Sequence, residues 1–399
     1  MLGHLTVDSY VGVLPVLYPL LIGRFHLSLA TVGLVSLAYG GTAAISQPLF
    51  GVIADRYGTR MTGVALGWTA LTFSLAGFVP SFPLLLVLAC ASGLGSGAFH
   101  PLGALDVLAL LPERRRSSGM SIYVTAGTVG VAIGPLIGIL VFRLLGIQGT
   151  ILLVIPGIAG GAYLLWRMRG SAGAAAGARL RTKGAPSGAI PLFAMAVVVG
   201  VMMSRTWTVG VFQAFTPTWY RSLGYGPEFY GPLATTLVLA SAVGTIGCGT
   251  LADRYGRRVV IIATLVLSIP AILLFTMFPG PWAFGSAILI GFLAASTAPL
   301  MLLMAQQLMA RRAGLASGLV MGLGFVTAAV GIPITGAIGD RIGLQDALMT
   351  QAILAAATIV LAWYLPSEND VDRLAAAGEL AAPDRRREAS PAAASPTSG

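Results

Sequence analysis

Twelve apolar segments, each close to the length that a helix needs to cross a lipid bilayer, occupy most of this chain. About 20 apolar residues span the hydrocarbon, and loops that carry arginine, Gly-Pro or acidic residues separate one segment from the next. The pattern predicts an all-α integral membrane protein with twelve transmembrane helices. The segments cover residues 1–23, 30–53, 61–79, 83–111, 119–143, 148–166, 190–220, 229–252, 259–278, 282–309, 314–338 and 345–365.

The composition excludes a set of soluble domains. Charged residues make up 10% of the 399 residues, against about 25% in typical soluble domains, and hydrophobic residues make up 56%. So few ionic side chains could not cover the surface of a soluble globule. The 52 glycines and 23 prolines are residues that let membrane helices pack closely and bend.

The net charge of +10 comes from short loops between apolar segments, so nucleic acid is not expected as a partner. One set of alternate loops, together with the C-terminal tail, holds most of the 24 basic residues, including Arg114 to Arg116 and Arg311 with Arg312. Because basic loops stay inside, both chain ends are predicted to be cytoplasmic, in the inner membrane of a bacterium and beside anionic lipid.

Chemistry that needs a cofactor has no visible support in the sequence. Cys90 and Cys248 are the two cysteines, and both lie in apolar segments, which excludes a disulfide framework, a thiolate zinc cluster and an iron–sulfur site within the chain. No Gly-x-x-x-x-Gly-Lys-Ser/Thr loop for ATP, no His-Glu-x-x-His and no Gly-x-Ser-x-Gly occurs. We therefore expect no cofactor, no metal and no enzymatic activity, and no cleavable signal peptide is evident.

The two halves of the chain repeat one another at a spacing of 198 residues. The pattern Gly-x-x-Ala-Asp-Arg-Tyr-Gly-x-Arg occurs at 51–60 and again at 249–258, and Gly33 recurs as Gly231. A parallel duplication predicts two six-helix bundles that rock about a substrate site between them. The expected parts are an N-terminal bundle (1–166), a Gly/Ala/Arg-rich cytoplasmic linker (167–189), a C-terminal bundle (190–365) and a disordered Pro/Ala/Arg-rich tail (366–399).

The same offset bears on the start of the chain. The seventh span begins near Ile190, so its counterpart in the first half would begin before Met1. We expect about two further helical turns upstream of Met1, which a longer reading frame with apolar codons would support.

The repeated loop motif joins the second span to the third and the eighth to the ninth. Its glycines permit a tight turn, its aspartates can accept from backbone N–H groups at the next helix start, and its arginines can pair with them or with lipid phosphate. The alternative is a plain orienting loop. The motif resembles the cytoplasmic signature of the major facilitator superfamily, and the resemblance extends over residues 1–365. It implies a monomer whose cytoplasmic side is held shut in one state by Asp55 and Asp253, with Arg114 to Arg116 and Arg311 with Arg312 as their expected partners. The other gating candidates of the motif are Arg56, Arg60, Arg254 and Arg258.

The fifth span carries Gly130-x-x-x-Gly134-Pro135-x-x-Gly138. Small residues four apart allow close helix packing, and Pro135 bends the helix. The run is similar to a motif of proton-driven exporters in the superfamily, which would make Gly134 and Pro135 part of the gating machinery. Ordinary helix packing is the alternative.

Ionisable residues inside the membrane are candidates for function because their burial is costly. His4 and Asp8 are four apart and share one helix face, and His100 and Asp106 lie in the fourth span. Since a carboxylate near an imidazole can exchange protons around neutral pH, we expect these four to couple transport to protons. His4 at the membrane interface, His100 as a packing residue and a half-solvated Asp106 are the alternatives. Arg205 in the seventh span keeps its charge and suits an anionic substrate group or a carboxylate.

Four fragments narrow the resemblance to the fosmidomycin-resistance branch of the superfamily, whose members are thought to exchange drugs for protons. They are His4-x-x-x-Asp8, Tyr18-Pro19-Leu20-Leu21, Gln47-Pro48 and Phe99-His100-Pro101.

Polar and aromatic residues along the spans could line a substrate cavity. The interfacial aromatic belt is the alternative for those near span ends. Together with Arg205, the candidates are Tyr39, Gln47, Tyr123, Trp207, Phe212, Gln213 and Gln306.

These features predict a secondary transporter that works by alternating access, in which protons and a small amphiphilic or anionic drug compete for one cavity. A proton-coupled importer of a small metabolite such as a sugar, an organic acid or an organophosphate fits the same residues. A sensor or scaffold without transport is the third class.

Overall fold

The computed structural model describes residues 1–57, 59–110, 116–168, 191–294, 297–309, 313–371 and 373–374, and these residues are almost entirely helical. Lipid cannot satisfy backbone N–H and C=O groups, so apolar segments of this length close their hydrogen bonds within a helix. The helices are α1 (Leu2–Phe25), α2 (Leu29–Ser36), η1 (Leu37–Gly41), α3 (Thr42–Tyr57), α4 (Thr62–Ser74), η2 (Leu75–Gly77), α5 (Phe82–Leu110), α6 (Arg116–Leu145), η4 (Gly146–Leu153), α7 (Val154–Met168), α9 (Leu192–Ser222), α10 (Pro227–Tyr255), α11 (Arg257–Met277), α12 (Ala283–Ala294), α13 (Ala298–Leu308), α14 (Ala313–Ile342) and α15 (Leu344–Ala362).

The twelve expected spans correspond to these helices, within a few residues at each end. Within the part of the chain that the structure describes, ten stretches are long and apolar enough to cross a membrane. One of the ten, 122–167, joins the fifth and sixth spans through η4, while the third span is divided into α4 and η2. The second span contains the π-helical turn η1 at its centre, and the tenth is described as α12 and α13 on either side of residues 295–296, which lie outside the described part of the chain.

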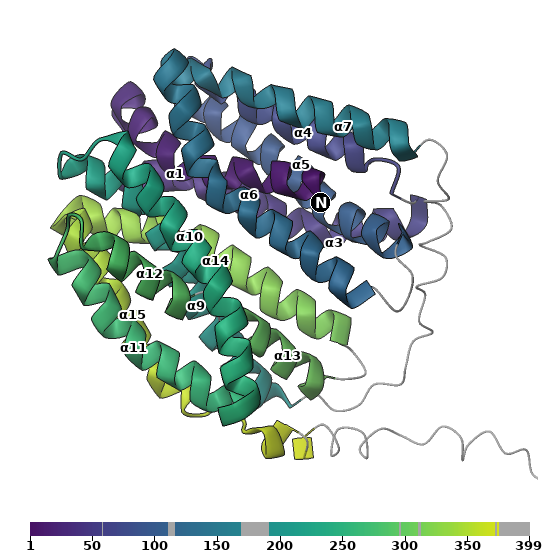
Figure 1. The fold of residues 1–399 in the computed structure, drawn as a ribbon, viewed down its shortest axis with the longest axis vertical. Helices are drawn as coiled ribbons and strands as arrows, with labels where there is room; N and C mark the ends of the chain where they lie inside the picture. The colour runs from purple at the N-terminus through teal and green to yellow at the C-terminus, as the bar shows by residue number, and fades with distance from the viewer. Residues whose placement is uncertain are drawn as a thin grey trace, which may run out of the picture.

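Each half packs in the same way, as a duplicated sequence requires. In the N-terminal half α1 lies against α6, α3 against α5, and α4 against α7, while in the C-terminal half α9 lies against α14, α10 against α12, and α11 against α15. Figure 1 shows the first half (purple to blue) above the second (teal to yellow). The spans that pair are therefore the same ones in both repeats.

The two halves meet near one face of the molecule. We call the face at which α1 begins and α15 ends the terminal face, and the opposite one the distal face. At the distal face α2 lies against α14, and α6 lies against α10. Gly33 on α2 allows this approach, since an added Cβ would lie 2.8 Å from the Cα of Pro333. Its repeat partner Gly231 on α10 lies against Ile139 of α6 in the same way.

Two polar bridges cross the same junction. Asp340 on α14 accepts hydrogen bonds from the backbone N–H groups of Leu29 (2.7 Å) and Ala30 (2.9 Å), where a helix N-terminus favours negative charge. Arg143 on α6 pairs with Glu228 in the first turn of α10 at 2.8 Å. The two bridges join equivalent helix ends in the two repeats, one through backbone N–H groups and the other through an exposed ion pair.

Replacing Asp340 by asparagine should loosen this closure. Asparagine keeps one acceptor oxygen but loses the charge at the α2 N-terminus, a cost of about 0.3–1 kcal/mol to this conformation because Asp340 is exposed. The ratio of distal-closed to distal-open molecules should therefore fall by about two- to fivefold. Spin labels at His26 and Arg221, which are exposed at the distal face, would report the change by pulsed electron resonance. Asp346→Asn, at an exposed acid of the same face, should leave the distances unchanged.

The start of the expected C-terminal tail is folded in the structure. Residues 368–371 form a helical turn that Ser367 and Asp370 cap, and Val371 is buried against the C-terminal half. The hydrogen bonds from Ser367 lower the pKa of Asp370. This departs from the prediction for 366–374, because Val371 and Leu374 supply apolar contacts that the composition of the whole tail concealed. The rest of the tail and nearly all of the linker lie outside the described residues.

Candidate functional site

Three ionisable side chains that the sequence separates by up to 96 positions meet inside the N-terminal half. His4 and Asp8 stand one turn apart on α1, with His4 Nε2 3.3 Å from Asp8 Oδ2. His100 comes from α5 and places its Nε2 3.4 Å from Asp8 Oδ1. The side chains of His4, Asp8 and His100 keep 11%, 15% and 28% of their surface exposed, so the cluster is sheltered but reachable.

Small residues on α6 bring α1 close enough to form this cluster. Gly130 lies against the backbone of Leu5, and Gly134 lies against the backbone of Gly12, so α1 and α6 touch almost without intervening side chains. One turn earlier, Gly127 faces Asp8 and His4 directly. The glycine spacing in the fifth span therefore serves close packing, and that packing also positions the ionisable residues.

Tyr123 fixes the orientation of His4. The His4 Nδ1–H group donates to the backbone carbonyl oxygen of Tyr123 at 2.8 Å, and the two rings stack with their centres 4.1 Å apart. A carbonyl oxygen can only accept, so Nδ1 must carry the hydrogen. In a neutral His4 the other nitrogen, Nε2, then has only a lone pair, and that lone pair faces the carboxylate.

The contact between His4 Nε2 and Asp8 Oδ2 thus needs a positive charge between two acceptors. A proton on either atom would supply it, giving an imidazolium–carboxylate pair or a neutral acid that donates to the imidazole. His100 can donate from Nε2 to the other carboxylate oxygen, and its Nδ1 is buried with no hydrogen-bond partner among the described residues. The facing atoms of His4 and Asp8 are therefore ones that a proton or another cation can bridge.

Asp106, the fourth predicted coupling residue, lies apart from this cluster. It is nearer the terminal end of α5 and accepts a hydrogen bond from the Thr62 hydroxyl of α4 at 2.7 Å. The contact ties the third span to the fourth. Its role in coupling stays a prediction.

Arg205 is buried within the C-terminal half. One of its terminal nitrogens donates to the carbonyl oxygens of Leu293 and, at 3.0 Å, Ala294, which are the last residues of α12. Carbonyl oxygens attract a cation, so Arg205 links α9 to α12 within the C-terminal half. The Arg205 Nε group is buried and has no partner in the described part of the chain.

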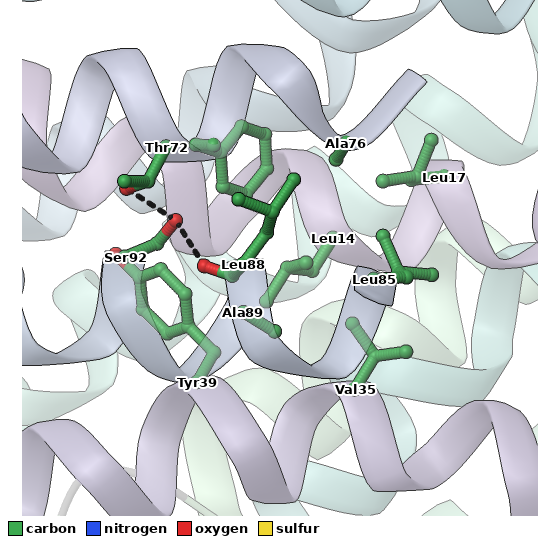
Figure 2. A pocket seen from close by; sticks show the side chains of 11 residues that line it. Leu14, Leu17, Val35, Tyr39, Thr72, Ala76, Leu85, Leu88, Ala89 and Ser92 are labelled. Carbon is green, nitrogen blue, oxygen red and sulfur yellow. Dashed lines mark hydrogen bonds between the residues drawn. The ribbon is translucent and has the colours of Figure 1, made fainter. Parts of the chain in front are cut away.

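Tyr39 lies inside the N-terminal half, beside a cavity of about 10 Å³ that suits a single water molecule. Figure 2 shows Tyr39 near Ser92, whose hydroxyl bonds Thr72 Oγ1 and the Leu88 carbonyl. The other lining residues are apolar, and they come from α1, α2, α4, η2 and α5. This cavity is part of the bundle core.

The predicted substrate residues of the C-terminal half lie in varied surroundings. Trp207 donates from Nε1 to the Thr335 hydroxyl of α14, and Gln306 bridges α13 to Ser317 of α14. Phe212 is fully buried against Phe275. Gln213 of this half is half-buried, as is Gln47 on α3 of the N-terminal half. Their roles in substrate binding stay predictions.

Of the predicted gating residues, those of the repeated loop motif that the structure describes lie at the terminal face, whereas Gly134 and Pro135 lie within α6. Asp253 and Arg254 are exposed at the end of α10, Arg60 is exposed before α4, and the Arg258 guanidinium donates to the Trp363 carbonyl. The side chains of Asp55 and Arg56, and the arginine loops at 111–115 and 310–312, fall outside what the structure describes. Their pairing therefore stays a prediction.

Sequence reasoning missed the α6 residues that complete the cluster. Gly127 and the Tyr123 carbonyl carry no charge, and every residue has a backbone carbonyl, so the sequence cannot indicate which one accepts a side-chain hydrogen bond. The one available signal was that Gly127 extends the glycine ladder of the fifth span by one step. The distal bridges of Asp340 and Glu228 were missed because each partner is more than 80 residues away.

Replacing Gly127 by alanine should disturb the cluster. The added methyl group would collide with the Asp8 carboxylate, and it would lie 2.7 Å from His4 Nε2. We expect proton-driven transport to fall by about tenfold, because both side chains must shift. Gly318→Ala on α14, the repeat counterpart of α6, meets nothing within 4 Å and should keep full activity. Equal transport by the two variants would contradict the assignment.

The comparisons with known proteins agree with the fold. The chain matches the Major Facilitator Superfamily over residues 1–233 and 197–395. It is 29% identical to the uncharacterized MFS-type transporter YfnC of Bacillus subtilis, covering 92% of this chain and 91% of the relative. It is 24% identical to the fosmidomycin resistance protein of Escherichia coli, covering 86% of each. Shorter matches include a multi-drug resistance efflux pump of Streptococcus pneumoniae and a probable L-galactonate transporter of Escherichia coli.

Solved structures share the architecture. A bacterial homologue of the human lysosomal transporter Spinster, in an inward-facing and unoccupied conformation, aligns with a TM-score of 0.69 at 16% identity and covers 96% of each chain. This likeness concerns the fold alone. Together with the duplicated bundles and the match along the sequence, it identifies the chain as a member of the Major Facilitator Superfamily, a multi-pass membrane transporter.

Proposed function

We propose that this protein is a proton-coupled antiporter that exports small drugs or other amphiphilic or anionic compounds across the inner membrane of a bacterium. It acts as a monomer by alternating access. Support for export comes from the relatives named for fosmidomycin resistance and drug efflux, and from the glycine motif of the fifth span.

The cation held between His4 and Asp8 carries the proposal. As argued above, His4 Nε2 and Asp8 Oδ2 are both acceptors at 3.3 Å unless a proton is shared between them. Loss of that proton leaves a lone pair against a carboxylate and drives the two groups apart. Gly127 of α6 lies directly against both side chains, so their separation would press on α6, which contacts α10 at the distal junction.

Competition between proton and substrate then couples the two fluxes. A proton that stabilises one conformation and a substrate that stabilises the other weaken each other's binding, so their coupling free energy is positive and a proton gradient can drive export. The arginine loops at the terminal face orient that face to the cytoplasm in our proposal, with Asp55 and Asp253 closing it in the alternate state. The substrate would enter between the two bundles from there.

Proteoliposome flux under an imposed pH gradient tests the function. Phosphonates, cationic dyes and small metabolites would be offered in turn, with proton movement followed by an entrapped dye. Substrate export that moves protons the opposite way supports the antiporter. Movement of a metabolite together with protons would instead establish the importer, which the L-galactonate relative favours. No substrate-dependent proton flux would leave a sensor or scaffold.

A further inference from the structure

We propose that His4, Asp8 and His100 form a binding site for one divalent transition-metal ion, with Zn²⁺ as the ion that best fits the ligand set. Their ligand atoms all lie within 4.8 Å of one another, although the residues come from α1 and α5. The sequence predicted no metal site, because the third ligand lies 92 positions from the second and no spacing motif joins them.

The distances suit tetrahedral coordination. Zinc binds imidazole nitrogen and carboxylate oxygen at about 2.0–2.2 Å, so two ligands of one tetrahedral ion stand about 3.4 Å apart. The separations here are 3.3 Å from His4 Nε2 to Asp8 Oδ2 and 3.4 Å from His100 Nε2 to Asp8 Oδ1. The two imidazoles approach different oxygens of the Asp8 carboxylate, so the side chains must rotate for one ion to bind both nitrogens together with one or both of these oxygens.

The chemistry of the donors points to the same class of ion. Two imidazoles and one carboxylate suit zinc and its neighbours in the first transition row, whereas magnesium and calcium prefer oxygen ligands alone. Three protein ligands leave one open position, which water or a substrate group can occupy.

The hydrogen bond that His4 makes to Tyr123 orients the His4 ring as a metal ligand. The Nδ1–H bond to the Tyr123 carbonyl leaves the Nε2 lone pair directed at the cluster, which is the outer-shell arrangement that metal-bound histidines use. The Nδ1 atom of His100 and the Tyr123 hydroxyl are buried with no partner among the described residues, so polar groups remain for a bound water. The lone pairs that would bind the ion are those that share the proposed coupling proton. Bound zinc would therefore block coupling, and this consequence alone rests on the proposed function.

Zinc titration of the full-length protein in lipid nanodiscs, purified through a tag without histidine, tests the site. Isothermal calorimetry should show one tight ion per chain, and Co²⁺ in its place should give the visible absorption of a tetrahedral complex. His4→Gln and His100→Gln should each weaken zinc binding by at least about tenfold. All variants would carry Cys90→Ala, which removes an exposed thiol.

The third histidine provides the matched control. His26 is exposed at the far end of α1, with a left-handed backbone that asparagine also adopts, so His26→Asn should leave zinc binding unchanged. Unchanged binding in both His4→Gln and His100→Gln, with normal elution of the folded protein, would overturn the proposal. Proton-driven transport in a protein that binds no zinc would refute the metal site while upholding the antiporter. Tight zinc binding without proton-coupled transport would uphold the metal site and refute the antiporter.

Discussion

Proteoliposomes that contain Asp8→Asn should show no proton-driven transport, with flux at the level of protein-free vesicles. The asparagine amide cannot take up a proton, but its N–H group can donate to the Nε2 lone pair of His4. The substitution therefore replaces the shared proton by a permanent neutral hydrogen bond. We expect the folded state and substrate binding to survive, so that substrate exchange without a gradient continues while coupling is lost.

Asp346→Asn is the matched control for this experiment. Asp346 is an exposed acid in the first turn of α15 and lies away from the cluster. It should transport as the wild type does. Unaltered gradient-driven transport by Asp8→Asn would show that Asp8 is not the proton carrier. Loss of exchange as well as coupling would point to a structural role for Asp8 instead.

Gly33→Leu should have the second large effect, by preventing closure of the distal face. The first side-chain carbon would already lie 2.8 Å from the Cα and 2.9 Å from the backbone nitrogen of Pro333, and backbone atoms cannot move aside as a flexible side chain can. Overpacking typically costs about 1–3 kcal/mol, which lowers the population of the distal-closed state by about 5- to 150-fold. A transporter that must visit both states would then lose most of its turnover.

Spin-label distances across the distal face, between His26 and Arg221, would measure this shift, and transport assays would measure its consequence. Gly23→Leu is the control, since Gly23 lies at the end of α1 on the same face and an added Cβ meets nothing within 4 Å. Unchanged distances in Gly33→Leu would show that α2 and α14 separate too easily for this contact to set the equilibrium.

The prediction of twelve spans succeeded because bilayer thickness acts on each segment by itself. The length and hydropathy of segments such as 30–53 and 314–338 are enough to predict that they span the membrane, whatever helices lie beside them. The internal repeat added that the second half should pack as the first does, which the α1–α6 and α9–α14 pairs satisfy. A departure such as the π turn of η1 depends on neighbouring helices, so hydropathy could not reveal it.

The candidate site also has features that the sequence predicted and features that only the packing of helices determined. The rarity of charge in apolar segments singled out His4, Asp8, His100 and Arg205, because an ionisable group in the membrane is costly wherever it lies. Which of them act together was decided by packing: α5 carries His100 to Asp8, whereas Arg205 is held by the carbonyls of α12 in the other half.

The sequence by itself thus determined the span count, the duplication and the family, along with the short set of charges worth testing. Only the tertiary structure decided that His4 must keep its hydrogen on Nδ1, that a cation is needed between it and Asp8, and that two bridges at equivalent helix ends close the distal face. The physical reason is the distance along the chain over which each interaction acts. Hydropathy and helix length act along the chain, whereas the direction of a lone pair depends on a carbonyl group 119 residues away.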